Sequence, residues 1–112
     1  MKAGDRAERI AAGYLQRKGL ALIEMRYRCR WGEIDLILRD RETVVFAEVR
    51  LRRSKTFGGA AYSVDRRKQA RIIATARHYL ARTKEAACRF DVVLLEAIEP
   101  PRIEWIRDAF SA

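Results

Sequence analysis

The feature that most constrains this chain is a pair of apolar runs within Gly32–Arg50, separated by a short polar interruption. Both runs are rich in Ile, Leu and Val, which is typical of β-strands, and their spacing predicts a hairpin. If the turn is centred between Arg41 and Glu42, opposed residues have numbers that add to the same total. This register places Asp35 directly across from Glu48.

The predicted register gathers charged side chains on one face of the hairpin. Side chains alternate between faces along a strand, so Asp35 and Glu48 project on one side, together with the opposed residues Glu33 and Arg50. Two carboxylates directly opposite each other destabilise a sheet. We therefore expect a cation between them, either a divalent metal held by oxygen ligands or the side chain of Arg50. The alternative is an ordinary solvent-facing surface on which Glu33 and Arg50 form a weak ion pair.

The remaining patterns predict two helices and three further strands. In chain order we expect a helix over Ala3–Lys18 that ends at Gly19, a strand over Leu20–Arg30 with an irregularity near Glu24, the hairpin, a helix over Val64–Lys84 capped by Ser63, and strands over Arg89–Glu96 and Arg102–Arg107. A helical crossover between the third and fourth strands implies that they run parallel in a mixed sheet. The length suits a single α/β domain over residues 1–112.

The charge balance points to a polyanionic partner. Lys and Arg number 24 against 15 acids, giving a net charge of +9. Most of the bases are arginine, whose planar fork suits phosphate, so nucleic acid is the first expectation. A membrane surface is the competing one, but the first helix mixes its bases with acids and small alanines rather than bulky apolar residues.

Apolar and metal-binding patterns set further limits. No apolar run is long enough to span a membrane and the N-terminus lacks the apolar centre of a signal peptide, so we expect a cytoplasmic protein. The two cysteines, Cys29 and Cys88, have no metal-ligand spacing and are expected to be buried or half-buried thiols. A zinc site is improbable because His78 is the single histidine.

Basic residues gather on either side of one predicted loop, over residues 51–62. The Gly58-Gly59 pair predicts a mobile loop beside the acidic face. A solvated surface is the commonest explanation for such charge, but few acids accompany these bases, which favours contact with phosphate. The predicted nucleic-acid-binding residues are Arg52, Arg53, Lys55, Arg66, Arg67, Lys68 and Arg71.

Two polar residues fall on helix faces that are otherwise apolar. Glu8 lies at the edge of the first helix stripe, where it either looks toward the sheet or simply favours the helix dipole. Gln69 falls within the inward stripe of the second helix, so it needs a hydrogen-bond partner.

Three segments together carry a family resemblance that covers almost the whole chain: AGDRAERIAAGYLQRKGL, GEIDLI followed by VFAEVRLRR, and FGGAAYSVDRRKQARI. The chain resembles the YraN-like family of bacterial proteins, which is similar to the PD-(D/E)xK, or restriction-endonuclease-like, nucleases and to the archaeal Holliday-junction resolvases. The resemblance implies an αβββαβ core, a mixed central sheet flanked by helices.

The resemblance also implies roles for particular residues. Asp35 matches the metal-binding aspartate of these nucleases and Glu48 the second acidic ligand, with the Val49 carbonyl completing the protein donors. Glu8 matches a helix glutamate near the metal, and Gln69 a supporting helix glutamine. The ion is Mg²⁺ or Mn²⁺, and the chemistry is hydrolysis of a phosphodiester bond.

The chain departs from the nuclease pattern at two points. Glu33 precedes Asp35 by two residues, so the literal Pro-Asp pair is absent. Arg50 stands where these nucleases usually place lysine, and it orients water or contacts phosphate rather than acting as a base, because it stays protonated. Three interpretations therefore remain open: a structure-selective DNA endonuclease acting as a homodimer, a catalytically silent nucleic-acid-binding protein, and a protein-interaction module on the same fold.

Overall fold

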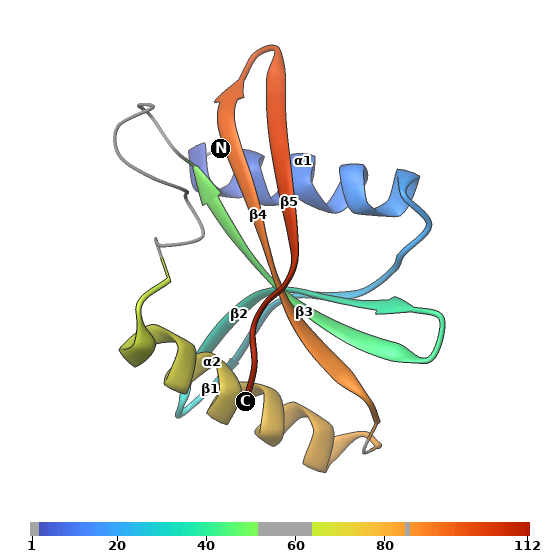
Figure 1. Cartoon of the computed structure of the whole chain (residues 1–112), viewed down its shortest axis with the longest axis vertical. Helices are drawn as coiled ribbons and strands as arrows, with labels where there is room; N and C mark the ends of the chain where they lie inside the picture. Colours follow the sequence, from blue (N-terminus) through green and yellow to red (C-terminus); the bar gives the residue numbers. More distant parts are fainter. Residues whose placement is uncertain (1–2, 52–63, 85) are drawn as a thin grey trace.

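A computed structural model describes residues 3–51, 64–84 and 86–112 of the chain. Along the chain they form α1 (Ala3–Arg17), β1 (Ala21–Cys29), β2 (Gly32–Asp40), β3 (Thr43–Leu51), α2 (Arg66–Arg82), β4 (Cys88–Ile98) and β5 (Pro101–Phe110) (Figure 1). The strands make one sheet in the order β1-β2-β3-β4-β5, in which β3 and β4 are parallel and the other neighbours are antiparallel. The predicted mixed sheet and αβββαβ order are confirmed, and β5 extends the sheet at one edge.

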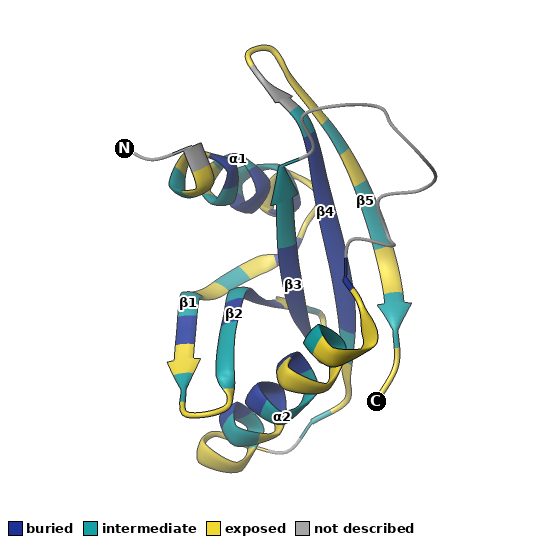
Figure 2. Cartoon of the chain, turned by 90° about the vertical axis from the view of Figure 1, so that its left-hand side faces the viewer, coloured by how far each residue is buried: buried dark blue, intermediate teal, exposed yellow. Residues whose placement is uncertain are grey.

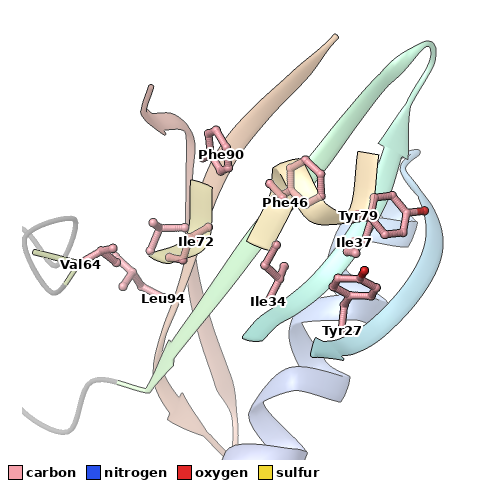
Figure 3. Close-up of a cluster of buried hydrophobic side chains, with 11 residues drawn as sticks. Tyr27, Ile34, Ile37, Phe46, Val64, Ile72, Tyr79, Phe90 and Leu94 are labelled. Atoms are coloured by element: carbon pink, nitrogen blue, oxygen red, sulfur yellow. The ribbon is translucent and has the colours of Figure 1, made fainter. Parts of the chain in front are cut away.

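The sheet is covered by one helix on each face, as the alternation of apolar residues along its strands requires. Leu36, Leu38 and Val45 pack with the buried alanines and Leu15 of α1. The other face packs against α2 through a cluster that includes Phe46 and Ile72 (Figure 3). The apolar run of β4 contributes to both clusters, which confirms the prediction of a strand covered on both sides.

Local signals place the helix ends with one correction. Gly19 follows α1 with φ of +100°, a conformation that glycine adopts without steric cost. The second helix begins at Arg66, and its N-cap is Asp65, whose carboxylate accepts a hydrogen bond of 2.8 Å from the Lys68 N–H. The predicted cap Ser63 lies outside the described residues. Serine and aspartate are equally good caps, so sequence preference alone did not separate the two positions.

The β2–β3 hairpin has the predicted register. Leu36 pairs with Ala47 and Asp40 with Thr43, so the turn is centred between Arg41 and Glu42. The ladder ends at Leu36, whereas β2 goes on pairing with β1 down to Gly32. Figure 2 shows this end of the β1–β2 hairpin turned away from β3. The predicted irregularity near Glu24 is confirmed as a register shift between Leu22 and Glu24.

The last two strands are longer than predicted, because bulges near Phe90 and beyond Leu95 let β4 and β5 continue to pair. Within β4, Asp91 is fully buried and accepts hydrogen bonds from the Arg89 guanidinium, the Trp105 indole N–H and the Asp108 backbone N–H. These donors satisfy a carboxylate that the surrounding apolar run gave no reason to expect.

The structure also bears on the predictions for the cysteines and for membrane-spanning segments. The cysteines are unpaired, with Cys29 half-buried as predicted, but Cys88 is exposed because it stands at the first position of β4. Among the helices of the described residues, none has the length and apolar character needed to cross a membrane.

Candidate functional site

Asp35 and Glu48 lie side by side where β2 and β3 part. Beyond the last ladder pair, no strand of the described residues pairs with β3 on that side, and side chains contact its backbone there instead. The Val49 N–H donates to Asp35 Oδ2 at 2.8 Å, and the Asp35 N–H lies 3.4 Å from Glu48 Oε2. The predicted juxtaposition of the two acids is confirmed.

Burial raises the pKa values of both acids in this pair. The Glu48 side chain is only 3% exposed. Burial, followed by the charge of Asp35, raises the pKa of Glu48 to about 7. Burial also raises the pKa of Asp35 to about 6, although the hydrogen bond from the Val49 N–H acts in the opposite direction. Two carboxylates with raised pKa values in one site favour a bound cation at neutral pH.

Two cationic side chains approach the pair. Lys68 Nζ, from the first turn of α2, lies 3.6 Å from Glu48 Oε1, and its charge lowers the pKa of both acids. The Arg50 charge acts in the same direction, and the Arg50 Nε atom is buried without a hydrogen-bond partner in the described part of the chain. Lys68 was expected to lack an acid partner, which is wrong because that partner comes from β3.

Glu33 does not pair with Arg50. It forms an ion pair with Arg28, its directly opposed neighbour in the β1–β2 ladder. The β2–β3 ladder ends before Glu33 would meet Arg50, so the register of the other hairpin decides its partner. The predicted Glu33–Arg50 pair is therefore wrong.

The Glu8 side chain is directed toward the sheet, as one of the two interpretations of its position predicted. Its side chain is 15% exposed, and the Arg26 Nε atom donates to it at 2.7 Å. The Glu8 charge raises the pKa of Asp35. Arg26 also bonds to Asp5 at 2.8 Å, so two acids from α1 neutralise this arginine of β1.

Gln69 has the partner that its position demanded. Its Nε2 atom donates to the Val64 carbonyl at 2.9 Å, which holds the segment that leads into α2. His78 is half-buried, and its Nδ1 atom lies 2.6 Å from the Tyr27 hydroxyl. Arg82 donates to the same hydroxyl at 3.1 Å.

The acidic pair opens into a hollow of about 440 Å³ with a basic rim on one side. The rim is formed by three bases from the exposed side of α2. The hollow is lined by Gly32, Glu33, Asp35, Glu48, Asp65, Arg67, Lys68, Arg71 and Ile72. Of the other predicted phosphate contacts, Arg66 is exposed at the start of α2, whereas Arg52, Arg53 and Lys55 lie outside the described residues.

The donor set suits a hard divalent cation that keeps much of its water. Among the described residues no group of three His, Cys, Asp or Glu side chains is placed to hold a metal, so a cation at this site would take its carboxylate ligands from Asp35 and Glu48. Mg²⁺ is commonly bound by one or two carboxylates with water and substrate phosphate. The Val49 carbonyl leaves the same edge of β3 as the N–H that reaches Asp35, so it is a third available oxygen.

Comparison with known proteins places the chain in a family. Residues 7–95 match the model of uncharacterised protein family UPF0102. The chain is 56% identical over 109 residues to a UPF0102 protein of Nitrosomonas europaea, covering 96% of this chain and 92% of the relative. It is 51% identical to one of Methylobacillus flagellatus, covering 97% and 96%, and 45% identical to one of Pseudomonas aeruginosa, covering 97% and 92%. The chain therefore belongs to the UPF0102 family, the YraN-like family that its sequence motifs indicate.

Proposed function

We propose that this protein is a divalent-metal-dependent nuclease that hydrolyses phosphodiester bonds of DNA. The observation that carries the proposal is the Asp35–Glu48 pair, one half-buried and one buried carboxylate, both with raised pKa values, in a hollow whose rim is basic. Lys68 and Arg50 offset the charge of the pair only in part, since both pKa values stay raised, and a cation together with a phosphate would satisfy both the acids and the basic rim.

Asp35, Glu48 and the Val49 carbonyl would hold the metal. Mg²⁺ or Mn²⁺ there would supply a water of lowered pKa and positive charge against the phosphate. Arg50 donates to a phosphate oxygen, a role that would give its buried Nε atom the partner that it lacks among the described residues. Arg67 and Arg71 hold neighbouring phosphates at the rim of the hollow.

Lys68 supplies the ammonium group that position 50 lacks. In the metal-free protein its Nζ atom neutralises Glu48 from 3.6 Å. With a metal on the acidic pair, Lys68 would be free to turn its ammonium group, on a long flexible side chain, toward a substrate oxygen. Arg50 on β3 and Lys68 on α2 would therefore together take the role that a single active-site lysine usually has in the PD-(D/E)xK nucleases.

The decisive experiment is cleavage of linear duplex, single-stranded and four-way-junction DNA by the purified protein with Mg²⁺, Mn²⁺ or EDTA. We expect cutting with either metal, none with EDTA, and none by Asp35→Asn. Arg77→Gln, which removes an exposed charge from α2 outside the lining of the hollow, should cut as fast as the wild type. Cutting that survives both EDTA and Asp35→Asn would refute the proposal and point to a contaminating nuclease.

A catalytically silent DNA-binding protein is the second candidate. It is favoured by Lys68 and Arg50, which compensate the acidic pair without any metal. Salt-sensitive DNA binding without cleavage of any substrate in either metal would select this candidate. The absence of both activities would select an interaction module.

A further inference from the structure

Trp31, in the turn between β1 and β2, stands out on the surface of the described residues. It is 48% exposed, and with Ile23 it is one of the two large apolar side chains there that remain exposed. A tryptophan in water leaves much apolar area unburied, so its position relative to the acidic pair matters.

The turn places Trp31 at the edge of the candidate site. Its neighbours Gly32 and Glu33 both line the hollow that contains Asp35 and Glu48. Gly32 also sits close against α2, because a Cβ atom added there would lie 3.2 Å from Thr75 Oγ1 and 3.8 Å from the Arg71 Cβ atom. The indole is therefore carried on a turn that is braced against the basic side of α2.

The surroundings of the indole are cationic. The guanidinium carbon of Arg30 lies 4.6 Å from the centre of the Trp31 ring and so covers one of its faces. Arg71 borders the hollow on the α2 side of the turn. An aromatic face among arginines is the arrangement with which proteins bind single strands, the ring taking the base and the arginines the phosphates.

Resting on the proposed function, we infer that Trp31 stacks on an unpaired nucleobase and that the substrates are DNAs with unpaired bases close to the cut. In a continuous duplex each base is stacked on both faces, so a ring on a turn can reach only a base that has left the stack. Single strands, bulges and branch points expose such bases, whereas intact duplex does not.

The distance along β2 indicates how close the base lies to the cut. Trp31 and Asp35 are four residues apart, which at about 3.3 Å per strand residue is about 13 Å. Stacked nucleotides advance about 3.4 Å along the axis, so the unpaired base lies within about four nucleotides of the phosphate at the acidic pair. The basic surroundings favour this occupant over an apolar protein surface, which would bury Arg30 and Arg71 without counter-charge.

Binding in EDTA separates this inference from cleavage. The probes are three labelled DNAs of equal length: a perfect duplex, the same duplex with one unpaired base, and the single strand. We expect the wild type to prefer the two DNAs with unpaired bases. Trp31→Ala should weaken their binding by about 5- to 150-fold, the range for loss of one base–aromatic stack, and leave duplex binding unchanged.

Two variants make the result specific. Trp31→Phe keeps an aromatic face and should retain most of the preference. Ile23→Ala removes the other exposed apolar side chain and should change nothing. Single-stranded DNA should also quench tryptophan fluorescence in the wild type, and the quenching should vanish in Trp31→Phe, which retains Trp105.

Each outcome assigns success or failure to one claim. Equal weakening of all three DNAs by Trp31→Ala, or no preference in the wild type, would overturn the inference while leaving metal-dependent cleavage intact. A Trp31-dependent preference in a protein that never cuts would refute the nuclease proposal but uphold recognition of unpaired bases. Binding to none of the three DNAs would overturn both claims.

Discussion

At the scale of single residues, the acidic pair should make the metal-free protein less stable as pH rises. The pKa of Asp35 rises from 3.8 to about 6 and that of Glu48 from 4.5 to about 7 on folding. Because folding favours the protonated forms, their contribution to stability is complete below about pH 4 and is lost as pH rises through 6 to 7. Asp35→Asn in EDTA should therefore gain stability relative to the wild type between pH 5 and 8, by about 2 kcal/mol.

Chemical denaturation at several pH values measures this difference. Asp5→Asn, which removes a half-exposed acid that pairs with Arg26 at the start of α1, should follow the wild-type curve apart from a small constant offset. Mg²⁺ should raise the melting temperature of the wild type more at pH 8 than at pH 5, because protons compete with the metal for the same carboxylates. A wild-type and Asp35→Asn pair with parallel pH curves would contradict the raised pKa values.

Arg50 should tolerate replacement by lysine, whereas replacement of either Arg50 or Lys68 by alanine should remove most of the cleavage. Cleavage by the wild type should be slow and strictly metal-dependent, and Arg50→Lys should keep or raise it, because lysine can also serve proton transfer. Arg50→Ala and Lys68→Ala should each lose about 10²–10⁴-fold, as is typical when a positioned catalytic group is removed. Initial rates on one substrate at saturating Mg²⁺ measure the effect.

Thermal melting of the same variants is the necessary control. Lys68→Ala removes the charge that faces the buried Glu48, so the rates are compared at a temperature at which melting shows both proteins to be folded, and any loss of rate is then chemical. If Arg50→Ala cuts as fast as the wild type under conditions where Asp35→Asn is inactive, Arg50 has no catalytic role.

At the scale of elements, one buried carboxylate adds to the antiparallel ladder that attaches β5 to β4. Asp91 joins β4 to β5 through the Trp105 indole and the Asp108 N–H, and it also neutralises Arg89. Asp91→Ala should cost about 3–5 kcal/mol, because it leaves the Arg89 charge without one of its two acids inside the fold. Urea denaturation followed by tryptophan fluorescence measures the loss.

Asp108→Asn is the matched control for Asp91. Its side chain is exposed and its backbone N–H is unchanged, so it should stay within about 0.5 kcal/mol of the wild type. Comparable destabilisation by the two variants would show that the strand end, rather than the buried carboxylate, sets the stability.

At the scale of the whole molecule, the net charge of +9 should make DNA binding strongly salt-dependent. Each phosphate neutralised on B-DNA contributes about 0.9 to the slope of log affinity against log salt. The double variant Arg67→Gln, Arg71→Gln should reduce that slope by about 2. Fluorescence anisotropy between low and moderate salt measures it.

A variant of equal charge tests whether location matters. Lys18→Gln with Arg41→Gln removes the same charge from a separate hollow at the β2–β3 turn, at the other end of β2 from Gly32. Its salt slope should remain at the wild-type value. Equal slopes for the two double variants would mean that binding is diffuse and that the rim of the candidate site has no special part in it.

The order of the elements, the hairpin register and the pairing of Asp35 with Glu48 could all be predicted from the sequence. Each depends on local regularities: a period of two in strands, a period of 3.6 in helices and the symmetry of a turn. The parallel β3–β4 pair followed from connectivity, since a helix between strands implies a crossover.

The charge partners were decided only by the tertiary structure. Glu33 pairs with Arg28, Arg26 with Glu8, and Lys68 with Glu48. The last two pairs join elements that are far apart in sequence, and the first depends on where the β2–β3 ladder stops. Ion pairs form between whichever charges the packing brings within about 4 Å, and no local period encodes that distance. The sequence by itself therefore determined that Asp35 and Glu48 lie side by side. The packed fold decided how deeply these acids are buried and which bases pair with them.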